Sequence, residues 1–169
     1  DIERLYEVPG IGKKRVEKIA ESWEKQKDIK IVMLFLQGCG VSTAYAAKIY
    51  RQYGKESIDT VKANPYKLAD DIWGIGFKTA DGIAAKMGYE KNDLRRCKSG
   101  ITYTLSHLSE EGHVYAEEEQ LLKAAIDLLE ADEESIRQAM AEMLQSEDLI
   151  QEGDALYMPP FYYAEVGTA

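Results

Sequence analysis

Apolar and polar residues follow one arrangement that occurs three times in the first 90 residues. In each copy a short apolar stretch ends in a turn with two glycines, and a helix rich in Ala and Lys follows. The Asn64-Pro65 pair predicts a helix stop followed by a helix start. The helices predicted for this part of the chain cover residues 13–23, 29–36, 41–53, 56–63, 66–70 and 77–87.

The pattern changes after Gly88. Two helices are predicted to begin behind capping aspartates, Asp93 and Asp132, with a further helix over residues 117–129 between them. A short extended segment is expected over residues 112–115. Two short apolar runs flank Gly153-Asp154 and predict a β-hairpin, so the order is three helices followed by a hairpin, as in a winged helix.

Charge is distributed unevenly over the 169 residues, whose formal net charge is −9. Residues 1–90 hold 15 Lys and Arg against 13 Asp and Glu, whereas residues 91–169 hold 6 against 17. The acidity is therefore a property of the second half, and the first half remains a candidate for binding an anion. There is no run of 18 apolar residues, which predicts no membrane span.

Cysteine usage is sparse. Cys39 and Cys97 are the only two, which indicates a reducing compartment such as the cytoplasm, without a disulfide framework. With two histidines besides, no metal site is expected.

The glycine turns carry the candidate chemistry. Glycine permits positive φ and close approach of another backbone, and the apolar residue between two glycines can anchor the turn. The free N–H groups of the turn and of the next helix's first turn form an anion site suited to a phosphate. One such turn alone is more often a plain helix corner, but three copies favour a shared role. The turn residues are Gly10, Ile11 and Gly12; Gly38, Cys39 and Gly40; and Gly74, Ile75 and Gly76.

Cations follow two of the three turns. Lys13 and Lys14 follow the first, and Lys78 with Thr79 follows the third, where they could neutralise phosphates. The second turn is followed by Ser42 and Thr43 with no cation before Lys48, so it is expected to be structural. Three aromatic residues of this part, Trp23, Phe35 and Trp73, are expected to be buried, with base stacking as the alternative for Trp73.

These motifs resemble the helix-hairpin-helix family, which occurs in tandem in DNA repair nucleases, ligases and helicases. The stretch from Asn64 to Asp81, together with Val8–Ile19 and Glu110–Tyr115, resembles the N-terminal region of the longer RecD-like DNA helicases. The fold class expected is therefore mainly α: tandem helix-hairpin-helix repeats over 1–90, then a winged-helix-like α/β-hairpin domain over 91–160. Residues 161–169 are expected to be a linker towards a helicase motor.

The resemblance implies a 5′ to 3′ ATP-dependent helicase that acts in DNA repair or recombination. A phosphate loop ending in Gly-Lys-Ser/Thr is missing here, because Gly12-Lys13 and Gly54-Lys55 continue with Lys14 and Glu56. We therefore expect no catalytic residue and no cofactor in this chain, with ATP and Mg²⁺ acting in a motor that follows Ala169. The expected partners are the DNA phosphate backbone and that motor.

Two other functions stay open. The chain could be a protein-interaction module that docks on the motor or on a repair partner, which its net charge favours. It could also be an enzyme such as a nuclease or glycosylase, for which Asp81 beside the third turn is the one candidate catalytic carboxylate. The helix over 135–145, which would enter a DNA groove in a winged helix, has Arg137 as its only cation, and this disfavours a DNA-reading role.

Overall fold

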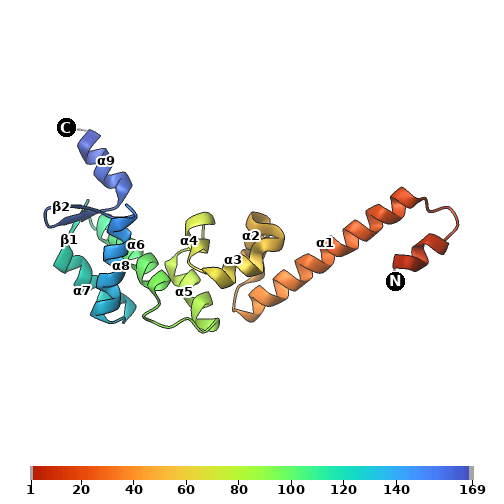
Figure 1. Cartoon of the computed structure of the whole chain (residues 1–169), viewed down its shortest axis with the longest axis horizontal. Helices are drawn as coiled ribbons and strands as arrows, with labels where there is room; N and C mark the ends of the chain where they lie inside the picture. Colours follow the sequence, from red (N-terminus) through yellow and green to blue (C-terminus); the bar gives the residue numbers. More distant parts are fainter. Residues whose placement is uncertain (1, 168–169) are drawn as a thin grey trace.

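The computed structural model describes residues 2–167 and shows an elongated, mostly helical molecule (Figure 1). A long helix extends from one end of a chain of short helices, and a three-helix unit with a small sheet forms the other end. The N-terminal residue Asp1 and the end of the predicted linker, Thr168 and Ala169, lie outside the described residues. Among the residues described, none of the helices combines the length and the apolar character that crossing a bilayer requires.

The long helix α1 runs without interruption from Lys13 to Gly38, preceded by the short 3-10 helix η1 over Ile2–Glu7. The prediction of two separate helices over 13–23 and 29–36 is therefore wrong. The intervening Glu-Lys-Gln-Lys-Asp segment contains only residues that helices tolerate well and neither Gly nor Pro, so nothing in it ends the helix. At 1.5 Å per residue, α1 is about 39 Å long.

Short helices pack around the C-terminal end of α1. They are α2 (Thr43–Tyr53), η2 (Gly54–Glu56), α3 (Ser57–Ala63), α4 (Lys67–Asp71) and α5 (Phe77–Lys86). The core that they share with α1 is formed by apolar side chains: Val32, Leu36, Cys39, Val41, Ala46, Ile49, Val61, Leu68, Ile72, Ile75 and Ile83. The predicted stop at Asn64-Pro65 falls between α3 and α4, as expected.

The C-terminal part has the element order of a winged helix. Helices α6 (Leu94–Glu110), α7 (Glu118–Leu129) and α8 (Glu133–Gln145) pack on one another, and α6 contacts both of the others extensively. The capping predictions are confirmed: the Asp93 carboxylate accepts from the Arg95 N–H at 2.9 Å, and that of Asp132 accepts from the Ser135 N–H at 2.7 Å.

Three short antiparallel strands close this part in the order β1-β3-β2. Strands β2 (Ile150–Glu152) and β3 (Ala155–Tyr157) form the predicted hairpin, with Gln151 opposite Leu156. The third strand, β1, is Ala116–Glu117, so the extended segment lies beyond the predicted residues 112–115. Ala116 pairs with Leu156 and is buried, which explains why the strand begins there.

Helix α5 contributes to two hydrophobic cores. Phe77, Ala80 and Ala84 belong to the core of the C-terminal part, whereas Ile83 belongs to the core around α1–α4. The division near residue 90 stays a prediction, and this packing favours a continuous body in which α5 is shared. Residues 159–167, most of which were predicted as a linker, form helix α9 (Pro159–Gly167).

Candidate nucleic-acid interface

Each of the three turns begins with a glycine that has a positive φ. Gly10 has φ 89°, Gly40 has φ 80° and Gly74 has φ 93°, and a helix begins three residues after each. The second turn is therefore Gly40-Val41-Ser42, and its prediction as Gly38-Cys39-Gly40 is wrong by two residues.

The physical reason for this shift lies at the end of α1. Gly38 is the last helical residue. Beyond it the Gly40 N–H donates to the Gln37 carbonyl and the Val41 N–H to the Leu36 carbonyl, both at 3.0 Å. These two bonds form a Schellman motif, in which the left-handed residue must be Gly40 and not Gly38.

The apolar residue in the centre of each turn points towards the core, as predicted for Ile11 and Ile75, but in the second turn it is Val41 and not the predicted Cys39. Ile75 is 3% exposed and Val41 is 6% exposed, and Ile11 is half-buried. The Ile75 N–H also donates to the Ile72 carbonyl at 3.2 Å, which closes the third turn.

The first and third turns differ from the second in their helix N-termini. Gly12 and Gly76 are the N-cap residues of α1 and α5, and among the described residues no side chain caps either helix. Ser42, in contrast, caps α2 by accepting from the Tyr45 N–H at 3.3 Å. The Arg15 N–H of α1 donates to the Gly12 carbonyl at 2.9 Å, but no side chain of the described residues occupies the other first-turn N–H groups of α1 and α5, whereas Ser42 occupies one donor of α2.

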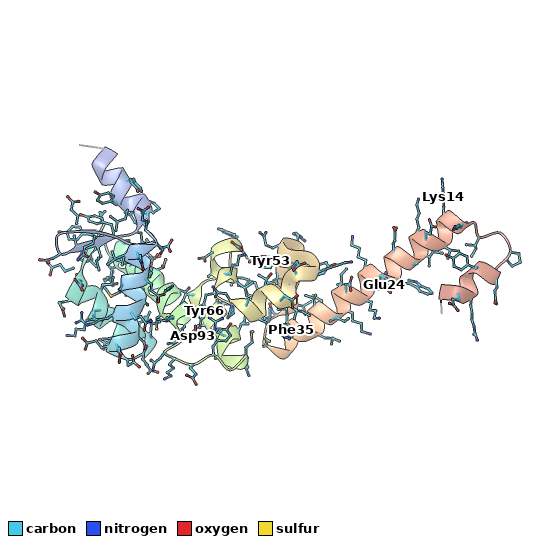
Figure 2. The ribbon with its side chains drawn as sticks, viewed as in Figure 1. Lys14, Glu24, Phe35, Tyr53, Tyr66 and Asp93 are labelled. Atoms are coloured by element: carbon cyan, nitrogen blue, oxygen red, sulfur yellow. The ribbon has the colours of Figure 1, made fainter. Side chains whose placement is uncertain are left out.

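The predicted cations lie at the available turns. Lys13, Lys14 and Lys78 are exposed, and Thr79 is half-buried. Figure 2 shows Lys14 projecting from the far end of α1. No carboxylate of the described residues lies within ion-pair distance of these three lysines.

The fold adds two lysines that sequence reasoning did not assign to a turn. The amine Nζ of Lys48, on α2, would lie 3.4 Å from a Cβ placed on Gly74, and Cε of Lys86, on α5, would lie 3.9 Å from one placed on Gly40. The expectation that the second turn has no nearby cation is therefore wrong. Its cation is Lys86, which lies more than 40 residues further along the chain, a proximity that only tertiary structure reveals.

Two tryptophans are more exposed than predicted. Trp73 is 92% exposed and Trp23 is 46% exposed, so the expectation that they are buried is wrong for both. Phe35 is half-buried and packs against the core, as expected. Trp73 lies at the corner between α4 and the third turn, where its neighbours Ile72 and Ile75 take the buried positions.

The first turn lies far from the other two. It precedes α1, the second turn follows α1, and the two are therefore separated by about 39 Å, the length of that helix. Figure 1 shows this end of α1 projecting away from the short helices. The third turn lies close to the second, because Lys48 of α2 reaches Gly74.

Asp81, the candidate catalytic carboxylate, is engaged in packing. It accepts a bidentate pair of hydrogen bonds from Arg96, at 2.8 and 3.2 Å, and another from the Tyr66 hydroxyl at 2.7 Å. Burial, together with the bond to Asp81, raises the pKa of the Tyr66 hydroxyl well above its ordinary value. Arg96 also donates to the Leu129 carbonyl at 2.7 Å, so this network joins α5, α6 and α7. Within residues 2–167, no three metal-binding side chains converge on one point.

The helix that would read DNA in a winged helix has no free cation among its described residues. Arg137, its one arginine, pairs with Glu118, Glu119 and Glu133 at 3.8, 3.6 and 2.8 Å. These ion pairs leave α8 without charge to offer to a phosphate, which agrees with the sequence-based expectation.

Left-handed glycine turns, each followed by a helix, define this chain as a tandem helix-hairpin-helix protein. Residues 25–115 match the family model of the ATP-dependent RecD2 DNA helicase HHH domain, and the chain belongs to that family. Residues 1–25 match a second model, the SAM-like helix-hairpin-helix tandem. An ATP-dependent RecD2 DNA helicase of Deinococcus radiodurans is 29% identical over 105 residues, which cover 62% of this chain. The aligned segment spans 14% of that relative's length.

Proposed function

We propose that this chain is the non-catalytic DNA-binding and scaffolding region of a 5′ to 3′ ATP-dependent DNA helicase that acts in repair or recombination. The observation that carries the proposal is the pairing, at the first and third turns, of uncapped helix N-termini with unpaired lysines. ATP and Mg²⁺ would act in the helicase motor and not on residues 1–169.

The chemistry of these two turns suits a phosphate group. Backbone N–H donors and the positive end of the helix dipole favour an anion at the same place where a lysine supplies a full charge. Phosphate contacts fix the position of a protein on DNA without reading bases, so binding should be indifferent to sequence. Turns of this kind hold the strand while other parts of the protein act on it.

The separation of the turns suits an extended ligand. About 39 Å between the first and second turns is close to one turn of B-DNA, which is about 34–36 Å long. One DNA molecule can therefore contact the first turn at one site and the third turn, which lies close to the second, at another site about 11 base pairs away at 3.4 Å each.

Matched pairs of substitutions test the proposal. Lys13→Ala/Lys14→Ala removes two free cations from the first turn, and Ser42→Ala/Thr43→Ala changes the corresponding residues at the capped second turn. Fluorescence anisotropy with labelled DNA should show weaker binding for the lysine variant, with a log–log salt slope flatter by about one to two units. The serine and threonine variant should bind like the parent. Equal binding by the lysine variant and the parent would contradict the proposal.

A protein-docking role is the second candidate, and one observation favours it. Trp23, Ile31 and Leu34 lie on one side of α1 and are 46%, 48% and 60% exposed. Together with the acidic C-terminal half, this apolar face could contact the helicase motor. A chain that binds no DNA at any salt concentration, yet associates with the motor domains in solution, would favour this second function.

A further inference from the structure

Trp73 is the most exposed of the large hydrophobic residues described, with 92% of its surface accessible. A tryptophan side chain is mostly apolar and is normally largely buried, so a tryptophan ring that is almost fully exposed indicates a contact surface. The ring is held at a rigid place, because Ile72 on one side and Ile75 two residues beyond are 7% and 3% exposed.

A cation and a second aromatic ring lie beside Trp73. The amine Nζ of Lys48 lies 6.0 Å from the centre of the Trp73 ring and 5.6 Å from the centre of the Tyr45 ring. The Tyr45 hydroxyl donates to the Gly74 carbonyl at 3.2 Å, which ties α2 to the third turn. Lys48 is therefore positioned between an exposed flat ring and the turn that we propose binds a phosphate.

The two carboxylates closest to Trp73 in the sequence, Asp70 and Asp71, interact with groups other than Lys48. Asp71 accepts from the Tyr53 hydroxyl at 2.7 Å and lies 4.0 Å from the Lys67 amine. Asp70 lines a separate cleft of about 580 Å³ together with Asp148 and Asn64. Burial, more than the nearby Asp71 and Asp148, raises the pKa of the Asp70 carboxyl.

We propose that Trp73 stacks on an unpaired base of a DNA strand whose phosphate lies at the third turn and Lys48. The inference rests on the proposed function and adds to it a preference for DNA with unpaired bases. Base faces are covered by their neighbours inside a duplex, so a protein ring can reach one only in a single strand or at a junction. An aromatic ring beside a cation is the arrangement with which proteins hold single strands without reading their sequence.

The test compares three DNAs of equal length: a single strand, a blunt duplex and a duplex with a single-stranded tail. The parent is compared with Trp73→Ala, with Trp73→Phe and with the matched control Trp23→Ala, which removes the other tryptophan of the chain. Trp73→Ala should weaken binding to the single strand and the tailed duplex roughly 5- to 100-fold, the effect of losing one stacked base. It should leave the blunt duplex unaffected. Trp73→Phe should restore most of the loss, and Trp23→Ala should bind like the parent.

The outcomes separate the inference from the proposed function. If the parent binds all three DNAs and Trp73→Ala binds them equally well, the stacking inference is wrong and the phosphate-binding proposal stands. If Trp73→Ala loses the same affinity for all three DNAs, stacking is also contradicted, because Trp73 then makes a contact that does not need an unpaired base. If the parent binds none of them, both are wrong, and Trp73 becomes a candidate contact to protein. A second readout is the fluorescence of Trp23→Phe, in which Trp73 is the only tryptophan: stacking should quench it on the single strand and not on the blunt duplex.

Discussion

Replacing Gly100 by alanine tests how closely α6 and α7 are packed. A Cβ on Gly100 would lie 2.5 Å from Cδ1 and 2.9 Å from Cγ of Leu129, and closer still to Cδ2. Leu129 is 1% exposed and lies in the close-packed core, so Gly100→Ala forces the two helices apart or makes the leucine shift against its neighbours. Overpacking of this kind costs about 1–3 kcal/mol.

Gly82→Ala is the matched control. Gly82 is exposed on helix α5, and a Cβ there meets no heavy atom of the described residues within 4 Å. Both substitutions replace a helical glycine by alanine, which favours the helix by about 0.8–1 kcal/mol, so the difference between the two variants isolates the clash. Gly82→Ala should be stabilised by up to about 1 kcal/mol, and Gly100→Ala should be less stable than it by about 1–3 kcal/mol.

Urea unfolding followed by circular dichroism measures both free energies of unfolding. In thermal unfolding the same difference corresponds to about 2–12 °C in Tm for a chain of this size. Leu129→Ala should cost less stability in the Gly100→Ala background than in the parent, because it also removes the clash. If Gly100→Ala is as stable as Gly82→Ala, the packing of α6 on α7 described above is wrong.

Three further predictions concern charge and function. Hydrogen bonds from Arg95 hold the pKa of the Asp93 carboxyl below its ordinary value, so its contribution to stability is present above about pH 4 and is lost as the pH falls through and below that value. Asp93→Asn keeps a capping side chain, so its free energy of unfolding should approach that of the parent on acidification; a constant difference between pH 7 and pH 3 would contradict this. Because the turns are about 39 Å apart, Lys13→Ala/Lys14→Ala should weaken binding to a duplex of about 24 base pairs and hardly affect one of about 8; equal effects would mean that the turns do not bind one DNA together. The pure chain should hydrolyse no ATP, as a phosphate-release assay can show, and turnover above background would refute its non-catalytic role.

Most helices could be predicted from the sequence because their limits are local. Asp93 and Asp132 each cap the helix that follows them directly in the sequence. Asn64-Pro65 separates two helices because of the backbone preferences of these two residues alone. The sequence did not predict that α1 continues through residues 24–28, because a segment without Gly or Pro is a weaker signal for a continuous helix than a Gly or Pro is for its end. The second turn was predicted two residues too early because Gly38 and Gly40 have the spacing of a glycine turn. The sequence does not show which of the two is left-handed, since this depends on where α1 ends.

The parts of the site that the sequence did not predict depend on contacts between distant residues. Lys48 reaches the third turn and Lys86 the second because α2 and α5 lie together around one core, and no local pattern contains that information. Trp73 was expected to be buried because most tryptophans are. Its exposure follows from Ile72 and Ile75, which take the two buried positions at that corner.

The salt dependence of DNA binding by the unmodified chain tests the central claim most directly. With about three to four lysine–phosphate contacts, a plot of log affinity against log salt concentration should have a slope of roughly −2 to −4. The slope and the affinity should be the same for DNAs of unrelated sequence, because phosphates carry no base information. No binding at low salt, or binding with a slope near zero, would contradict the claim that the glycine turns hold the DNA backbone.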